Sequence, residues 1–202
     1  MRVLIAGGTG FIGSIFIKAL LAQNYNISIL TRKKSGGHNT LSSVNYIRCD
    51  WQNQSALESA CQNVDLVVYC VGLNQSECEL NPGKADLVHN QYALDLGLAA
   101  RHAGVKKYIY LSTAHVYGHA LNGYVDESTN TLSNHPYGIS HLNGEKGLLN
   151  LRVKEYFDVR CLRLSNCFGV SEGEAVSDAS PVINYFCNTI IKLGVLPKLK
   201  NP

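Results

Sequence analysis

A group of glycines near the start of the chain has the spacing of a phosphate-binding turn. Gly8, Gly10 and Gly13 fit the pattern G-x-G-x-x-G, and Gly7 with Gly10 and Gly13 fits the looser G-x-x-G-x-x-G. A short apolar segment precedes the glycines and an amphipathic helical pattern follows, so the backbone can approach a pyrophosphate at the N-terminus of a helix. A glycine turn without a ligand is the alternative. The residues expected to hold a dinucleotide here are Gly7, Gly10, Phe11, Ile12 and Gly13.

Arg32 follows the second apolar segment, at the place where NAD sites usually carry an acidic residue for the ribose hydroxyls. A carboxylate would repel a 2′-phosphate, whereas the guanidinium group of arginine matches one with its fork of donors. The sequence therefore favours NADP over NAD as the cofactor. A solvated loop cation is the other interpretation of Arg32.

Short apolar segments rich in Val, Ile and Tyr alternate with helical patterns along the chain. The segments 65–71 and 107–113 are continuously apolar, which indicates strands covered on both faces and hence a parallel sheet between two layers of helices. We predict an α/β fold, a doubly wound parallel sheet of the Rossmann type. The expected strands are 2–6, 27–31, 44–49, 65–71, 107–113 and 158–164, and the expected helices are 11–23, 54–62, 85–103, 136–155 and 181–193.

Composition and charge exclude several classes of protein. Hydrophobic types make up 46% and charged types 16% of the 202 residues, which is typical of one globular domain. No apolar run approaches the roughly 18 residues of a membrane span. The net charge of +3 comes from scattered basic residues, so nucleic acid is not an expected partner. The seven cysteines include no CxxC pair, so we expect reduced thiols and a cytoplasmic protein. The histidines lack the spacing of a zinc site, so we expect no metal centre.

Taken together, six segments of the chain resemble successive motifs of the extended short-chain dehydrogenase/reductases. More narrowly, they are similar to the NAD-dependent epimerase/dehydratase family, whose members act on nucleotide sugars. The matching segments occur in the order of the family, from residue 1 to about residue 195. They are 7–13, Asp50 with Trp51, Asn90, 111–118, 136–140 and 163–166.

The resemblance implies a catalytic group built from a Ser or Thr, a Tyr, and a Lys four residues after the Tyr. It places the first at Thr113 and the second at Tyr137, with His141 where the family has its lysine. Tyr137 would accept a sugar hydroxyl proton while a hydride leaves the same carbon for the nicotinamide, and a nearby cation would populate the phenolate, since the ordinary pKa of tyrosine is about 10. A histidine is mostly neutral at pH 7. His141 is therefore either a working substitution or the mark of a degenerate site.

The resemblance also implies roles for residues around the catalytic group. Asp50 corresponds to an acid that contacts adenine, with an ordinary loop acid as the alternative, and Trp51 follows it as a further cofactor residue. Asn90 corresponds to an asparagine near the cofactor, with a surface asparagine as the alternative. His115 and Asn166 are expected on the substrate side.

Family members often pair through the helices that correspond to 85–103 and 136–155, which implies a homodimer. Both helices have apolar residues beyond a single stripe. In the first helix the apolar face comprises Leu87, Leu94 and Leu98, widened by Val88, Tyr92 and Ala99.

Family members continue beyond the helix at 181–193 into a small substrate-binding lobe. We therefore expect residues 1–202 to form a single dinucleotide-binding domain, with that lobe largely absent or truncated. Two functions are compatible with the sequence. The first is an NAD(P)-dependent epimerase, dehydratase or reductase that transfers a hydride between a carbon of a nucleotide sugar and nicotinamide. The second, which His141 favours, is an NAD(P)-binding sensor or assembly subunit without turnover.

Overall fold

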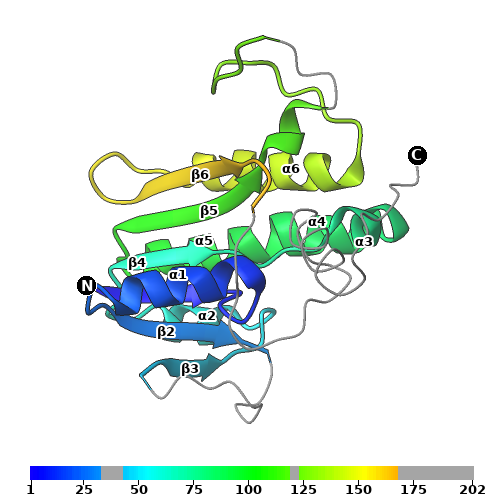
Figure 1. The fold of residues 1–202 in the computed structure, drawn as a ribbon. Coiled ribbons are helices and arrows are strands. Elements are labelled where there is room, and N and C mark those ends of the chain that lie inside the picture. The colour runs from blue at the N-terminus through cyan, green and yellow to red at the C-terminus, as the bar shows by residue number, and fades with distance from the viewer. Residues whose placement is uncertain (33–42, 119–122, 168–202) are drawn as a thin grey trace, which may run out of the picture. The chain divides into compact units, whose positions relative to one another are not determined.

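A parallel sheet forms the centre of the computed structural model, which describes residues 1–32, 43–118 and 123–167. Its six strands lie in the order β3-β2-β1-β4-β5-β6, and every neighbouring pair is parallel (Figure 1). The strands are β1 (Arg2–Ala6), β2 (Asn26–Thr31), β3 (Asn45–Arg48), β4 (Leu66–Tyr69), β5 (Lys107–Thr113) and β6 (Asp158–Leu164). The order reverses between β1 and β4, so the prediction of a doubly wound Rossmann-type sheet is confirmed.

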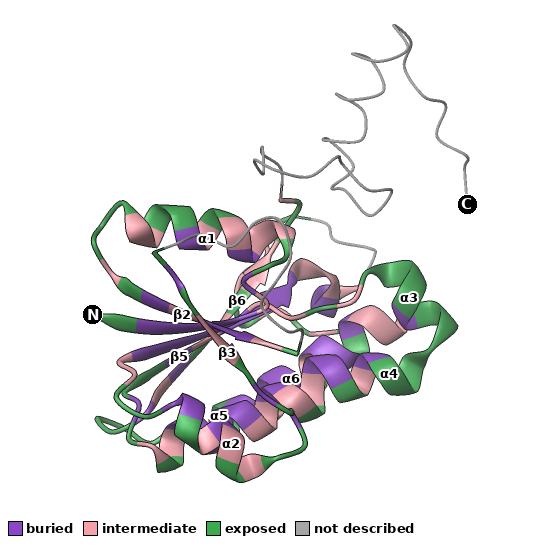
Figure 2. Ribbon diagram, turned by 90° about the horizontal axis from the view of Figure 1, so that it is seen from below, coloured by how far each residue is buried: buried purple, intermediate pink, exposed green. Residues whose placement is uncertain are grey.

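Helices cover both faces of the sheet (Figure 2). Val3 and Ile5 of β1 pack with Ile17 of α1 (Phe11–Leu21) in one apolar cluster. Leu4 belongs to the other cluster, together with Leu57 of α2 (Gln54–Ala60) and residues of α5 (Tyr92–His102) and α6 (Pro136–Asn150). Successive side chains of a strand point to opposite faces, which explains why the central strands are apolar at every position.

The helix predicted at 85–103 is confirmed over most of its length, but it begins three residues earlier and consists of three successive pieces. They are α4 (Pro82–Asp86), the single π-helical turn η1 (Leu87–Gln91) and α5. The short α3 (Gln75–Leu80) and the start of α4 were not predicted. The side chain of Asn74 accepts the backbone N–H of Glu77 and that of Asn81 accepts the N–H of Lys84, so asparagine caps start both helices.

The helix predicted at 136–155 ends earlier, because α6 stops at Asn150. The chain then turns back on itself: the N–H of Phe157 donates to the carbonyl of Val153 at 2.8 Å, and Glu155 has a left-handed φ of 71°. Phe157 is buried in the core, so its burial favours the turn over a continuation of the helix. The helix predicted at 181–193 lies outside the described residues.

The chain separates into two compact units, residues 1–165 and 166–202. The sheet and all the elements named above belong to the first unit. Within the described residues, no helix combines the length and the apolar character that a membrane span requires.

Candidate functional site

The glycine turn connects β1 to α1. Gly7 has a φ of 84°, and a Cβ there would lie 2.7 Å from the carbonyl carbon of Cys70. A Cβ on Gly13 would overlap the carbonyl oxygen of Gly7. These two glycines are therefore required by the packing of the turn itself.

Gly10 is different, because it is exposed and a Cβ there would meet only the carbonyl oxygen of Gly7, at 3.3 Å. It is the N-cap of α1 and makes no side-chain capping bond. The N–H groups of the first turn of α1 cannot bond within the helix, because no helical carbonyl precedes them. Two of these groups belong to Phe11 and Ile12, which are half-buried. An uncapped helix N-terminus behind a glycine turn fits the pyrophosphate of a dinucleotide.

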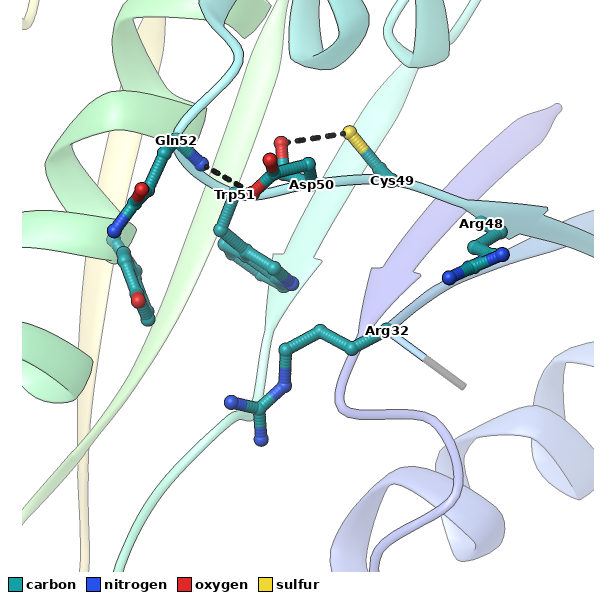
Figure 3. Close-up of a pocket in the computed structure, with 7 residues that line it drawn as sticks. Arg32, Arg48, Cys49, Asp50, Trp51 and Gln52 are labelled. Carbon is teal, nitrogen blue, oxygen red and sulfur yellow. Dashed lines mark hydrogen bonds between the residues drawn. The ribbon is translucent and has the colours of Figure 1, made fainter. Parts of the chain in front are cut away.

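A pocket of about 580 Å³ opens where β2 and β3 end (Figure 3). Arg32 follows β2, and Arg48 is the last residue of β3, where it pairs in register with Thr31. Both arginines are exposed, so their charges are available to a ligand. The lining residues are Arg32, Arg48, Cys49, Asp50, Trp51, Gln52 and Tyr92.

Two predicted cofactor residues, Asp50 and Trp51, lie in this pocket. Asp50 is exposed, and its Oδ1 accepts the backbone N–H of Gln52 at 3.1 Å. Trp51 is only 5% exposed and packs against Tyr69 and Tyr92, with ring centroids 5.9 and 5.5 Å apart. Trp51 therefore anchors the pocket floor to the core. Arg48 was missed by sequence analysis, although a basic residue at the end of the third predicted strand was a usable signal.

Thr113 and Tyr137 reach the carboxyl end of the sheet from different elements. Thr113 ends β5 and is buried, and its Oγ1 accepts the N–H of His115 in η2 (Ala114–Tyr117) at 3.2 Å. Tyr137 lies in the first turn of α6 and is half-buried. A Cβ on Gly138 would lie 2.6 Å from the carbonyl oxygen of His115, so glycine lets α6 pack closely on η2.

Three imidazole rings surround Tyr137. The centroid of its ring lies 4.9 Å from that of His141, 5.7 Å from that of His115 and 5.7 Å from that of His89. His141 and Tyr137 therefore meet on one face of α6, as their spacing predicts. His115 also lies within 3.0 Å of the side-chain nitrogen of Gln75.

His141 carries no positive charge at neutral pH. It is only 5% exposed, and burial, with the nearby His89 and His115, holds its pKa well below the ordinary value of 6.5. Its Nδ1 lies 2.9 Å from the hydroxyl of Tyr110. Lys146, in contrast, is exposed on the outer face of α6. The site therefore contains a neutral imidazole where the resemblance implies an ammonium group.

A buried ion pair stabilises the same end of the sheet. Glu145 of α6 is 2% exposed and accepts hydrogen bonds from two nitrogens of Arg163 of β6, at 2.7 Å from Nη2 and at 3.0 and 3.2 Å from Nε. Ser112 donates its hydroxyl to the same carboxylate, and Nη1 of Arg163 donates to the Tyr117 hydroxyl at 2.8 Å. These hydrogen bonds raise the pKa of Arg163 and connect η2, α6 and β6.

No described contact brings Asn90 or Asn166 to the three imidazole rings around Tyr137. The Asn90 side chain donates to the carboxylate of Asp86 at 3.2 Å, while its neighbour His89 faces Tyr137. Asn166 is exposed and begins the second unit. The cofactor role of Asn90 and the substrate role of Asn166 stay predictions. His89 was missed because the π-helical turn decides which side chain points inward.

The fold and the site define a class: a Rossmann-type protein of the short-chain dehydrogenase/reductase kind. The chain belongs to the NAD dependent epimerase/dehydratase family, whose model matches residues 3–196. This confirms the resemblance found in the sequence.

Individual proteins agree with the family. A UDP-glucose 4-epimerase of Halalkalibacterium halodurans is 27% identical over 90% of the chain and 55% of its own length. A dTDP-glucose 4,6-dehydratase of Streptomyces niveus is 24% identical over 84% of the chain and 54% of its own length. The chain thus spans about half the length of these curated relatives. The solved UDP-N-acetylglucosamine 4-epimerase of Methanobrevibacter ruminantium M1, in complex with UDP-N-acetylmuramic acid, has a TM-score of 0.84 and 26% identity, covering 100% of this chain and 66% of that protein.

Proposed function

We propose that the chain is an NAD(P)-dependent enzyme that transfers a hydride between a carbon of a nucleotide sugar and nicotinamide, as an epimerase, dehydratase or reductase. One observation carries the proposal: Tyr137 and Thr113 lie at the carboxyl end of the same sheet that presents the glycine turn and the pocket at β2 and β3. Ligands of open α/β sheets bind at this edge, where the strand order reverses.

Each side chain has a definite task in this proposal. The bound nicotinamide supplies hydride acceptance and donation. The phenol oxygen of Tyr137 exchanges a proton with the sugar hydroxyl that is oxidised or re-formed. Thr113 accepts a backbone N–H through its oxygen, so its own hydroxyl hydrogen can be donated to the sugar oxygen. His115 and Asn166 would contact the sugar.

A second function, dinucleotide binding without turnover, is favoured by one observation. His141 is buried and neutral, so it cannot supply the charge that lowers the pKa of a catalytic tyrosine. We prefer the enzyme, because Thr113, Tyr137 and the glycine turn all keep the types and places that hydride transfer requires.

The experiment that decides between the two is a turnover assay. The purified chain is mixed with NAD⁺ or NADP⁺ and with UDP-glucose or dTDP-glucose, and formation of the reduced cofactor and of sugar products is followed. We expect slow but measurable turnover that falls at least a hundredfold in Tyr137→Phe, since general acid–base catalysis contributes about 10²–10⁴-fold. Tyr124→Phe, on a tyrosine that is 89% exposed, is the control. Dinucleotide binding with no turnover in the parent protein would favour the second function.

We also propose that NADP is the preferred cofactor and that the chain forms a homodimer. The cofactor preference is supported by Arg32 and Arg48, two exposed cations at the ends of adjacent strands around one pocket. The dimer is supported by apolar side chains on the outer surfaces of η1 and α6, namely Leu87, Ile139 and Leu149.

A further inference from the structure

His89 and His141 form a stacked pair of imidazoles inside the candidate site. Their ring centroids are 4.0 Å apart and the planes differ by 20°. His89 comes from η1 and is fully buried, and His141 comes from α6 and is 5% exposed. The only π-helical turn among the described elements thus delivers a residue to the site, and such turns are frequent at functional sites.

The hydrogen bonds of His89 fix its tautomer. Its Nε2 lies 2.9 Å from the backbone nitrogen of Leu73, which can only donate, so Nε2 is the unprotonated nitrogen. Its Nδ1 therefore carries the hydrogen and donates to the hydroxyl oxygen of Ser140 at 2.8 Å. Ser140 in turn donates to the carbonyl of Tyr137 at 3.1 Å, so every donor in this series of hydrogen bonds has an acceptor.

The same reasoning fixes the tautomer of His141. The hydroxyl of Tyr110 has one hydrogen, which it donates to the carbonyl of His89 at 2.8 Å. Its oxygen therefore accepts the hydrogen on Nδ1 of His141, at 2.9 Å. Nε2 of His141 is left unprotonated, so it can only accept a hydrogen bond.

Nε2 of His141 is also the one ring nitrogen of the pair that remains accessible. Within the described part of the chain, no residue bonds to it, yet no buried side-chain nitrogen or oxygen lacks a partner. This nitrogen is therefore not fully enclosed, and its ring lies next to that of Tyr137.

Packing holds the pair rigidly in this arrangement. A Cβ on Gly144 would overlap the carbonyl oxygen of His89 and lie 2.9 Å from the hydroxyl of Tyr110, so the glycine lets α6 close onto η1. Burial lowers the pKa of His89 to about 4 and that of His141 well below its ordinary value, so both rings stay neutral.

We propose that His89 is a positioning residue that holds His141 as a neutral Nδ1–H imidazole, so that Nε2 of His141 accepts a hydrogen bond from a hydroxyl group of the bound ligand. This inference rests on the proposed function for the identity of the ligand. The hydroxyl belongs to the dinucleotide or to the sugar nucleotide, and both present the same chemistry to the imidazole. His141 thus differs from the lysine of the family in two ways. The imidazole is neutral, and its free nitrogen accepts a hydrogen bond, whereas an ammonium group is charged and only donates.

The experiment uses the full chain labelled with ¹⁵N in its histidines and glycines, with ring signals assigned from His89→Gln and His141→Gln. In the ligand-free protein at pH 7, we expect both His89 and His141 to show a protonated Nδ1 and an unprotonated Nε2. An Nε2–H tautomer or an imidazolium at position 141 would overturn the proposal.

Ligands are then added in two separate arms, dinucleotide alone (NAD⁺ or NADP⁺) and UDP-glucose alone. We expect the Nε2 signal of His141 to move in one arm, which identifies the hydroxyl that it accepts. If the amide signals of Gly10 and Gly13 show that dinucleotide binds and Nε2 moves in neither arm, the acceptor role is wrong. If neither ligand binds, the proposed function and the acceptor role fail together, while the ligand-free spectrum still decides whether His141 is held as a neutral Nδ1–H imidazole.

His89→Gln tests the positioning role directly. This change removes the stacked ring but keeps the backbone carbonyl to which Tyr110 donates, so we expect the Nδ1–H tautomer of His141 to persist. We expect the ligand-induced movement of its Nε2 signal to shrink and the affinity for that ligand to fall about fivefold, the equivalent of one hydrogen bond of about 1 kcal/mol. His102→Gln is the matched control, because His102 is exposed on α5 and pairs with Glu58 of α2. An unchanged affinity and an unchanged ligand-induced movement of the Nε2 signal in His89→Gln would overturn the positioning role of the His89 ring.

Discussion

At the scale of single residues, the proposed preference for NADP depends on two arginines. Arg32 and Arg48 bring two positive charges to its rim, and Asp50 is the one acidic residue among its lining residues. The Asp50 carboxylate already accepts the N–H of Gln52. A 2′-phosphate bound near the arginines would gain charge-assisted bonds that an unmodified ribose does not make.

Arg32→Ala is expected to weaken binding of NADP⁺ about tenfold to a hundredfold and to change binding of NAD⁺ little, since one charge-assisted hydrogen bond contributes about 1.5–3 kcal/mol. Arg48→Ala should act in the same direction. Calorimetric titration of both dinucleotides measures the two affinities. Arg160→Ala, at an exposed arginine of β6, is the control. An equal loss for NAD⁺ and NADP⁺ would mean that the arginines do not read the 2′-phosphate.

At the scale of elements, the β1–α1 turn combines a structural requirement with a binding surface. Gly13→Ala would force a Cβ against the carbonyl oxygen of Gly7 and to within 2.7 Å of Cα of Gly8. Neither contact is the end of a flexible side chain, so the turn must open. We expect a loss of at least about 2 kcal/mol in the free energy of unfolding, together with loss of dinucleotide binding.

Gly83→Ala is the matched control for this change. Gly83 is exposed in α4, and a Cβ there would be in ordinary contact 3.7 Å from the side-chain oxygen of Asn81. It should leave stability unchanged or raise it by up to about 1 kcal/mol, as expected for alanine in a helix. Urea unfolding of both variants checks the pair, and similar stabilities for the two would contradict a steric role for Gly13.

The elements also show what the sequence could and could not predict. The strands at 2–6, 107–113 and 158–164 agree residue for residue with β1, β5 and β6, because apolar strand segments bounded by polar residues have a strong local signal. The end of α6 depends on Phe157 reaching the core, which is a long-range contact without a local pattern.

The imidazole pair was harder to predict for a related reason. Thr113, Tyr137 and His141 followed from motifs, whereas His89 depends on η1, where a π-helical turn shifts the faces of the helix relative to a 3.6-residue repeat. The family resemblance indicated its neighbour Asn90 instead. Glu145 and Arg163 are 18 residues apart and meet only through the packing of α6 on β6.

At the scale of the whole molecule, the buried histidines link stability to pH. The native pKa of His89 is about 4 and that of His141 is well below 6.5, whereas both are about 6.5 in the unfolded chain. The unfolded state therefore binds more protons below pH 6.5, and stability is lost as the pH falls toward 4.

We expect the contribution of these two histidines to the free energy of unfolding to be constant above about pH 7 and to fall between pH 6.5 and 4, with His89 alone accounting for about 3 kcal/mol. Urea unfolding across this range measures the slope. His89→Gln should flatten the curve over the same interval, and His102→Gln, at an exposed histidine, is the control. A parent curve and a His89→Gln curve with the same slope would contradict the lowered pKa of His89.

The proposed dimer is also a property of the whole molecule. A Cβ on Gly97 would lie 2.6 Å from the side chain of Leu148, so small residues let α5 and α6 pack together and present one outer surface. Val88 and Ala99 are buried, and Tyr92 packs on Trp51, so these residues do not widen the outer face as the sequence predicts. The partly exposed residues that remain are Leu87, Leu94, Leu98, Ile139, Leu142 and Leu149.

Replacing both Ile139 and Leu149 by Asp places two charges in the centre of this surface. Since the two side chains are 41% and 44% exposed in the single chain, the fold should tolerate the change, whereas a dimer would have to bury both charges without partners. We expect a dimer for the parent protein and a monomer for the double variant by sedimentation equilibrium at tens of micromolar protein. Tyr124→Asp, at an exposed residue far along the chain from both helices, should remain a dimer. A monomeric parent protein would contradict the proposed dimer. A double variant that still dimerises would show that the dimer contact lies on another surface.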